Sequence, residues 1–360
     1  MFALPAPAHD PRSLRPTRAP GWPTLLLAGL LGMVAGCARH PLAGTRHEFT
    51  SIHMAIPFRI AVYAPDPVTA THAARAAFTR IEELNGILSD YLPESELNRL
   101  SATAGTGVEV PLSPSLATVL LAAQEIAGGS HGAFDATVGP VVQLWRRARR
   151  QRQLPDPARL ETARAAVGWT HLVLTGRPGS PGGVRGRLLK PGMRLDLGGI
   201  AKGYALDEAA RILREHGLRA FLVAGAGDLV AGDAPPGTRG WRVELPPLDA
   251  PDAPPSQFVL LHGAALCTSG DLFQHVEIDG RRYSHIVDPR TGVGLVDHSL
   301  VTVIGRTGME TDALATAASV LPPEAARRLC RRRRVEARII RRPGNVVESQ
   351  ATPGFQGWLE

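Results

Sequence analysis

Two adjacent glycines, Gly198-Gly199, separate a strand-like segment from a helix-like one, and this junction constrains the fold more than any other feature of the chain. Residues 195–197 before it are typical of a strand end, and a helix is expected to begin near Ile200. Glycine turns and helix N-termini present backbone N–H groups to anions. The spacing, however, matches neither the Walker nor the dinucleotide-binding phosphate loop. The alternative is an ordinary strand-to-helix turn whose glycines allow close packing.

A carboxylate and a hydroxyl four residues apart occur in the later block 311–316. Asp312 and Thr316 fall at the start of an expected helix, so their side chains share one face. Both supply hard oxygen ligands, which suit a Mg²⁺ ion that keeps some waters and takes substrate phosphates. The alternative is structural: Thr311 or Asp312 caps the helix, and Thr316 bonds back to the preceding turn.

A solitary histidine, His285, lies in the block 283–292 within an expected strand. Successive strand residues face opposite sides, so Ser284 and His285 cannot form a nucleophile–base pair. Asp288 could orient the imidazole. A solitary histidine is usually structural, although its ordinary pKa also suits proton transfer near neutrality.

Strands and helices alternate without a repeated β-α-β rhythm, which predicts one α+β domain. Expected strands span 53–64, 218–223, 241–245, 258–261, 300–304 and 334–340, and expected helices span 71–88, 113–128, 200–216 and 311–321. The Pro- and Gly-rich stretches 176–186 and 245–256 are expected to be exposed loops.

The first residues have the pattern of an export signal. Arginines at 12, 15 and 18 precede an apolar run at 25–34, which is shorter than the ~20 residues of a membrane-spanning helix. Cys37 follows Ala35-Gly36 and resembles a bacterial lipobox; an incidental cysteine after an ordinary signal peptide is the alternative. We therefore expect a lipoprotein-type signal peptide at 1–36, a linker at 37–50 and the folded domain at 51–360. The mature protein would be lipid-anchored at Cys37, on the periplasmic side of a bacterial membrane.

Charge and cysteine content exclude several other classes. The net charge is +7, but the arginine runs 146–152 and 331–334 contain no interleaved aromatics, so we expect solvated faces and no nucleic-acid partner. Cys267 and Cys330 could pair in an oxidising periplasm, but two cysteines in a large domain are no disulfide framework, and buried, unpaired thiols are expected. No Cys-x-x-Cys or His-Glu-x-x-His spacing supports a zinc site. Only two basic residues are lysines, Lys190 and Lys202, which suggests positions that need a compact ammonium.

Three blocks, at 195–204, 283–292 and 311–316, closely resemble in this order the ApbE family, the FAD:protein FMN transferases. Residues 132–140 with Leu144-Trp145 resemble the family's FAD-binding turn, and residues 89–97 resemble its segment beside the isoalloxazine ring. The resemblance runs from about Met54 to the C-terminus. It implies a tunnelling-fold-like domain of antiparallel sheets with packed helices.

The resemblance also implies roles for single residues. Magnesium would be held by Asp312, Thr316 and the main chain of Gly199, while His285 and Lys202 would act at the reaction centre. The flavin nucleotide would contact Met54, Tyr91, Ala133, Phe134, Asp135, Asp196, Lys202 and Ile286. Without the resemblance, Phe134 and Trp145 would be core aromatics and Tyr91 a loop-end tyrosine. The chain departs from the family pattern at Met54-Ala55-Ile56, where the family has Met-Gly-Thr, and at Gly225-Ala226-Gly227-Asp228, where it has Gly-Gly-Asp.

The implied activity is a Mg²⁺-dependent transfer of FMN from FAD to a threonine or serine of an acceptor protein, with release of AMP. The implied acceptors are exported flavoprotein subunits such as those of redox pumps. Two alternatives stay open: an FAD pyrophosphatase that gives FMN and AMP, in which water replaces the acceptor hydroxyl, and a flavin-binding lipoprotein without turnover. Retention of Asp312, Thr316 and His285 favours an enzyme, because storage of a flavin needs no base beside a metal.

Overall fold

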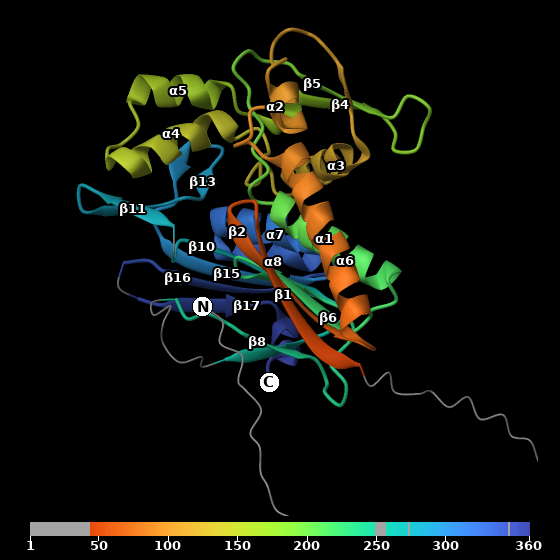
Figure 1. Ribbon diagram of the computed structural model, residues 1–360. Helices are drawn as coiled ribbons and strands as arrows, with labels where there is room; N and C mark the ends of the chain where they lie inside the picture. The colour runs from red at the N-terminus through yellow and green to blue at the C-terminus, as the bar shows by residue number, and fades with distance from the viewer. Residues whose placement is uncertain (1–43, 249–256, 273, 345) are drawn as a thin grey trace, which may run out of the picture. The chain divides into compact units, whose positions relative to one another are not determined.

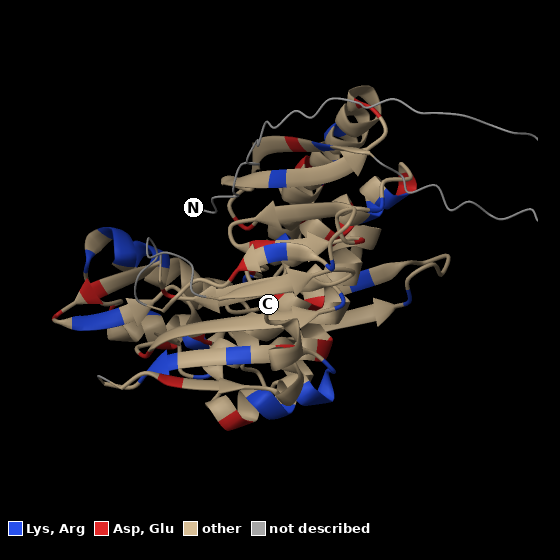
Figure 2. Cartoon of the chain, turned by 90° about the horizontal axis from the view of Figure 1, so that it is seen from below, with Lys and Arg blue, Asp and Glu red and all other residues tan. Residues whose placement is uncertain are grey.

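A computed structural model describes residues 44–248, 257–272, 274–344 and 346–360 of the chain (Figure 1). Its main element is an antiparallel sheet of eight strands in the order β1-β2-β6-β7-β10-β15-β16-β17. These strands span Thr45–His53, Ile56–Ala64, Phe221–Gly225, Asp228–Ala231, Ala265–Gly270, His298–Gly305, Glu336–Arg342 and Glu348–Ala351. With helices packed on this sheet, the expected α+β class is confirmed. The inner strands β6, β7, β10 and β15 carry a single charged residue, Asp228, and most of the strand surface in Figure 2 is uncharged.

Three helices cover one face of the sheet: α6 (Ala201–Glu215) packs against both α1 (Pro67–Leu88) and α7 (Gly308–Val320). Alternation along β2 explains both faces. Phe58, Ile60 and Val62 pack into the helix-side core, while Ala61 joins a second core on the other face. That second core also contains residues of β8 (Trp241–Glu244), β9 (Phe258–Leu261) and η2 (Pro353–Trp358). The helix α8 (Pro323–Arg332) packs beside α7.

The remaining elements surround one end of the helix layer (Figure 1). They comprise α2 (Glu96–Ser101), α3 (Pro114–Gly129), α4 (Gly139–Gln151), α5 (Pro157–Ala165), η1 (Trp169–His171) and the three-stranded sheet β3-β5-β4 (Val110–Leu112, Val184–Leu188, Leu172–Gly176). Two hairpins, β11–β12 (His275–Ile278, Arg281–Ser284) and β13–β14 (Val287–Asp288, Val293–Gly294), complete the fold. Helix α4 packs on the first hairpin through Trp145 and Tyr283, whose ring centroids lie 5.1 Å apart.

The start of the domain differs from the expectation. The segment expected as one strand at 53–64 is a turn followed by β2, because Met54 and Ala55 adopt positive φ angles of 49° and 61° and reverse the chain. Strand β1 then pairs with β2 from Thr45↔Ala64 to His53↔Ile56. The expected linker 37–50 is therefore wrong from Thr45 onward. The expected signal peptide and Cys37 lie outside the described residues, and no helix within them combines the length and apolarity needed to span a membrane.

Candidate active site

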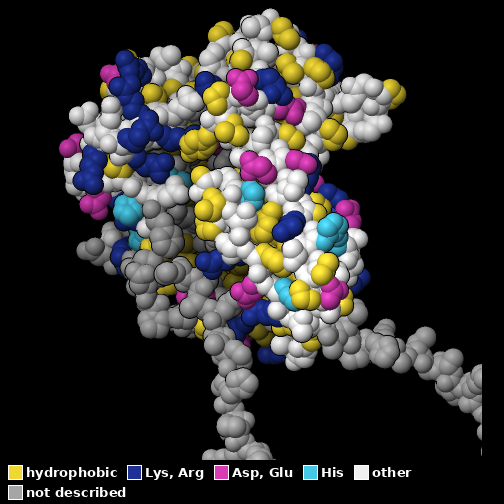
Figure 3. All heavy atoms as spheres, viewed as in Figure 1, with side chains coloured by type: hydrophobic (Ala, Val, Ile, Leu, Met, Phe, Trp, Pro, Cys, Tyr) yellow, Lys and Arg dark blue, Asp and Glu magenta, His cyan; other side chains and the backbone are white. Residues whose placement is uncertain are grey.

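A cleft of about 710 Å³ is lined by residues of α1, α4, α6 and α7 together with the loops between them. Basic side chains gather beside it, over α4 and α5 (Figure 3). Every residue to which the sequence assigned a site role lines this cleft: Met54, Tyr91, Ala133, Phe134, Asp135, Asp196, Gly199, Lys202, His285, Ile286, Asp312 and Thr316. Segments from near both ends of the domain therefore meet at one place.

Gly199, Asp312 and Thr316 form the oxygen-rich corner of the cleft. The cap of α7 is Thr307, so Asp312 lies inside the helix and the capping alternative for Thr311 and Asp312 is wrong. A Cβ atom on Gly199 would lie 2.8 Å from Thr316 Oγ1, so only glycine lets the backbone come this close. Asp312 is 4% exposed, and its Oδ2 accepts a hydrogen bond of 3.0 Å from the Gly203 amide.

The ligand chemistry of this corner suits magnesium. It offers one carboxylate, one hydroxyl and a closely approaching backbone, all hard oxygen donors. Among the described residues, no group of three or more His, Cys, Asp or Glu is arranged to hold a metal ion, so this corner would need further oxygen ligands from water or a substrate. A site with a single carboxylate leaves positions for water and for the phosphates of a substrate, as Mg²⁺ prefers.

Lys202, in the first turn of α6, points its ammonium group into the same corner. It forms an ion pair with Asp228, and its Nζ lies 3.6 Å from Asp312 Oδ1. Asp228 is 1% exposed and was missed by the sequence reading. The sequence pointed to this position only through the block 225–228, which departs from the family's Gly-Gly-Asp at Ala226 and had no assigned role.

His285 lies between β12 and β13, and not within a strand as expected. Its backbone amide and its ring Nδ1 each lie 3.0 Å from the carbonyl oxygen of Gln274. A carbonyl only accepts, so Nδ1 carries the proton and Nε2 keeps its lone pair. Burial lowers the pKa of His285 below its ordinary value of 6.5. The imidazole is therefore neutral at pH 7 and able to accept a proton at Nε2.

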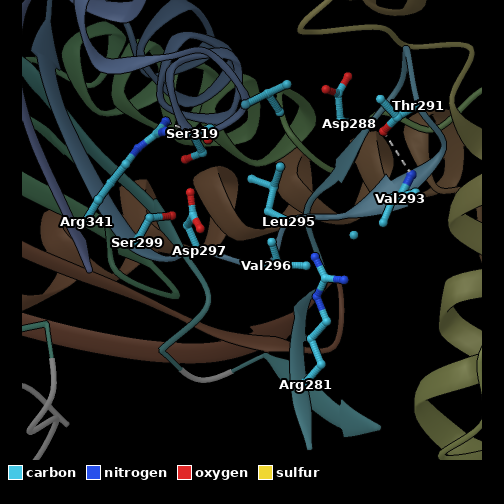
Figure 4. A pocket seen from close by; sticks show the side chains of 12 residues that line it. Arg281, Asp288, Thr291, Val293, Leu295, Val296, Asp297, Ser299, Ser319 and Arg341 are labelled. Atoms are coloured by element: carbon cyan, nitrogen blue, oxygen red, sulfur yellow. Dashed lines mark hydrogen bonds between the residues drawn. The ribbon is translucent and has the colours of Figure 1, made fainter. Parts of the chain in front are cut away.

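Asp288 does not orient this histidine. Its carboxylate forms an ion pair of 2.8 Å with Arg290 instead. Val287 lines the cleft, whereas Asp288 lines a separate cavity of about 230 Å³, because adjacent strand residues face opposite sides (Figure 4). The Gln274 carbonyl orients the His285 ring instead, by accepting a hydrogen bond from Nδ1.

Asp135 holds the turn after α3. Its Oδ1 accepts from the Thr137 amide and hydroxyl, both at 2.7 Å, and its Oδ2 accepts from the Trp169 amide at 2.8 Å. Burial raises the pKa of this carboxyl. These bonds fix the loop that places Ala133 and Phe134 along the cleft. Phe134 is 4% exposed, so it is a core aromatic that also contributes to the wall.

An arginine assigned to a solvated face lies in the cleft instead. Arg146 pairs with Asp90 and, at 2.9 Å, with Asp196, and its guanidinium stacks 4.2 Å from the centroid of the Tyr91 ring. Desolvation and the neighbouring charge of Asp90 raise the pKa of Asp196 to about 6. The helical spacing of Val142, Trp145, Arg146 and Arg149 puts all four on the cleft side of α4, which the arginine run concealed.

Comparison with known proteins identifies the class. In fold, the chain resembles solved flavin transferases. A Vibrio cholerae structure described as Flavin Transferase ApbE superposes with a TM-score of 0.77 at 25% identity, over 88% of this chain and 99% of that one. The flavinyl transferase ApbE of Pseudomonas stutzeri gives 0.76 at 28% identity, over 88% and 97%.

Sequence comparison gives the family. The model of the ApbE family matches residues 54–339, so the chain belongs to this family. Relatives named FAD:protein FMN transferase include that of Escherichia coli K12, 30% identical over 93% of this chain and 96% of the relative. The protein of that name from Salmonella typhimurium is 29% identical over 91% and 94%.

Proposed function

We propose that this protein is a magnesium-dependent FAD:protein FMN transferase. It moves FMN from FAD to the hydroxyl group of a threonine or serine in an acceptor protein and releases AMP. The observation that carries the proposal is the meeting of Lys202, His285, Gly199, Asp312 and Thr316 in one cleft of nucleotide size. Membership of the ApbE family supports it.

The reaction replaces the phosphoanhydride bond of FAD with a phosphoester bond to the acceptor. The acceptor hydroxyl oxygen attacks the phosphorus on the FMN side of the diphosphate, the bond from that phosphorus to the bridging oxygen breaks, and AMP leaves with that oxygen. His285 Nε2 takes the hydroxyl proton, since Nδ1 is committed to Gln274. Lys202 faces the negative charge of the diphosphate.

The oxygen-rich corner would hold the magnesium ion through Asp312, Thr316 and the backbone of Gly199. When bound there, Mg²⁺ supplies positive charge that offsets the charge building on the diphosphate. Phosphoryl transfer depends mainly on such positioning and electrostatics. The protein side chains therefore need little covalent chemistry of their own.

The flavin end of FAD is assigned to the other half of the cleft. Tyr91 is 70% exposed and stacked under Arg146, so its ring presents one flat apolar surface to a ligand. Met54, Ile286 and Phe134 supply further apolar contacts, and Asp196 offers a carboxyl for polar contact with the nucleotide.

The acceptor and the cellular site follow from the same proposal. The acceptor is an exported flavoprotein subunit that presents a threonine or serine in an accessible segment. Transfer takes place on the periplasmic side of a bacterial membrane, where a lipid at Cys37 would tether the enzyme.

Incubation with FAD, Mg²⁺ and a threonine-containing acceptor peptide, followed by mass spectrometry, tests the function. The expected product is peptide carrying one FMN, with an equal amount of AMP. Formation of free FMN and AMP without modified peptide would instead assign the cleft to FAD hydrolysis. Binding of FAD without any AMP would indicate a flavin-binding lipoprotein. Asp312→Ala is the matched control and should lose the Mg²⁺-dependent reaction.

A further inference from the structure

The Lys202 ammonium forms an ion pair with a buried carboxylate, Asp228, to which no role has been assigned. Asp228 is the first residue of β7 and is 1% exposed. Its Oδ1 accepts a hydrogen bond of 3.0 Å from the Thr268 amide, and its Oδ2 forms the ion pair with Lys202. The preceding turn reaches this position because Ala226 and Gly227 have φ angles of 48° and 94°.

The two carboxylate oxygens of Asp312 have different neighbours, and only one of them accepts a backbone hydrogen bond. Oδ2 already accepts the Gly203 amide, and Oδ1 faces the Lys202 ammonium at 3.6 Å. A divalent cation that binds Asp312 would therefore use the oxygen that Lys202 faces. The ammonium and the metal carry like charges, so they compete for this oxygen.

We propose, building on the function assigned above, that Asp228 is a positioning residue that holds Lys202 clear of Asp312 when a divalent cation binds. The pair with Asp228 keeps the ammonium in the cleft beside the diphosphate while it frees Asp312 Oδ1 for the metal. Without this carboxylate, Asp312 is the only carboxylate that Lys202 contacts among the described residues. The ammonium would then compete with the metal more strongly.

The affinity for a divalent cation should therefore depend on the charge of Asp228 and not on its shape alone. Asp228, Asp312 and Lys202 sum to one negative charge. Asp228→Asn leaves the group neutral but keeps an oxygen to accept the Thr268 amide, so a purely structural role would change little. Adding Lys202→Met restores the single negative charge and removes the competing ammonium.

Binding of Mn²⁺ alone, measured as loss of the free-ion electron paramagnetic resonance signal, tests this in the full-length protein. Mn²⁺ prefers the same oxygen ligands as Mg²⁺. Asp228→Asn should raise the dissociation constant about tenfold, a typical coupling between neighbouring charges. Lys202→Met should bind Mn²⁺ at least as tightly as the wild type. The double variant should return to within about threefold of the wild type.

Equal Mn²⁺ affinity of the wild type and Asp228→Asn would overturn the proposal, as would a double variant no tighter than Asp228→Asn. If Asp228→Asn does not fold, Lys202→Met alone decides, because weaker binding by this variant contradicts competition by the ammonium. Absence of Mn²⁺ binding by the wild type would overturn the metal site itself, and with it this inference. Failure of FMN transfer with the Mn²⁺ results intact would count against the transferase function only.

Discussion

His285 presents one ring nitrogen to the cleft because the other is held by the Gln274 carbonyl. Burial also lowers its pKa below 6.5, so the basic form is already dominant at neutral pH. We expect the transfer rate of the wild type to rise with pH as His285 loses its proton, with a midpoint below 6.5. The rate of His285→Ala should not rise with pH in this way. It should be roughly a hundredfold lower than that of the wild type, the usual scale for loss of a general base.

The measurement is a pH–rate profile of FMN transfer together with the FAD dissociation constant of each protein. Because the base acts only when the hydroxyl attacks, FAD affinity should change little. A variant that loses FAD affinity and keeps the wild-type pH dependence would show that His285 serves binding and that another group is the base.

Gly199 is the residue at which the oxygen-rich corner is most tightly packed against Thr316. A Cβ atom there would meet Thr316 Oγ1 at 2.8 Å and Thr316 Cγ2 at 3.2 Å, so Gly199→Ala must displace the hydroxyl or the backbone. A displacement of about 1 Å at a reaction centre can cost on the order of a hundredfold in rate. We expect that loss in Mg²⁺-dependent turnover. Gly182→Ala is the matched control, because a Cβ there meets nothing within 4 Å; similar losses in both variants would contradict the steric argument.

The residues with proposed chemical roles could be identified from the sequence, whereas the groups they contact could not. Asp312, Thr316, Lys202 and His285 carry recognisable side chains in recognisable blocks. His285 contacts the main-chain carbonyl of Gln274, and Lys202 contacts the buried carboxylate of Asp228. Neither contact can be predicted from the spacing of residues along the chain.

At the scale of elements, α7 carries Asp312 and Thr316 of the oxygen-rich corner and is anchored at both ends by side chains distant in sequence. Asp207 of α6 accepts from the Gly308 and Met309 amides at 2.7 and 2.9 Å. At the other end, Arg341 Nη2 donates to the carbonyls of Ala318 and Ser319 at 3.2 and 3.0 Å. Side chains thus satisfy terminal amides and carbonyls that have no partner within the helix.

Burial raises the pKa of Asp207 from 3.8 to about 6, which links the stability of this anchor to pH. Because the folded state binds this proton more tightly than the unfolded state, Asp207 contributes stability that is fully present below pH 3.8. This contribution is lost as the pH rises through about 6. Relative to Asp207→Asn, the unfolding free energy of the wild type should therefore fall between pH 4 and 6, by at most about 3 kcal/mol. Denaturant titrations at several pH values measure it. Asp233→Asn, at a carboxyl 57% exposed, is the control and should show no such difference; a parallel response of Asp207→Asn and the wild type would contradict the linkage.

Helices with strong end signals were predicted well. Helix α3 starts after Ser113 with Pro114 in its first turn, as expected, and α1 differs only by an earlier start at Pro67. Helix α4 was missed because its four arginines hide an apolar stripe that faces the cleft and the β11–β12 hairpin. Short hairpins such as β13–β14 carry too few residues for a periodic pattern.

At the scale of the whole domain, the cleft depends on long-range pairing that no local pattern encodes. The turn at Met54-Ala55 and the helix carrying Asp312 are far apart in the sequence but line the same cavity. Only the resemblance to a family brought these segments together in advance. The expected pairing state of Cys267 and Cys330 is confirmed, since both are buried free thiols.

The proposed attachment of the whole molecule to a membrane would depend on Cys37, which lies outside the described residues. The basic segment, short apolar run and Ala-Gly-Cys sequence predict lipidation at this thiol. After expression in a bacterium that processes lipoproteins, the wild type should enter the detergent phase of a two-phase extraction, because acyl chains bring about 0.8 kcal/mol per buried methylene. Cys37→Ser should stay in the aqueous phase and still transfer FMN to a soluble acceptor peptide at the wild-type rate, since the cleft lies wholly within residues 54–316. Partition of both proteins into the aqueous phase would refute the lipid anchor while leaving the proposed chemistry untouched.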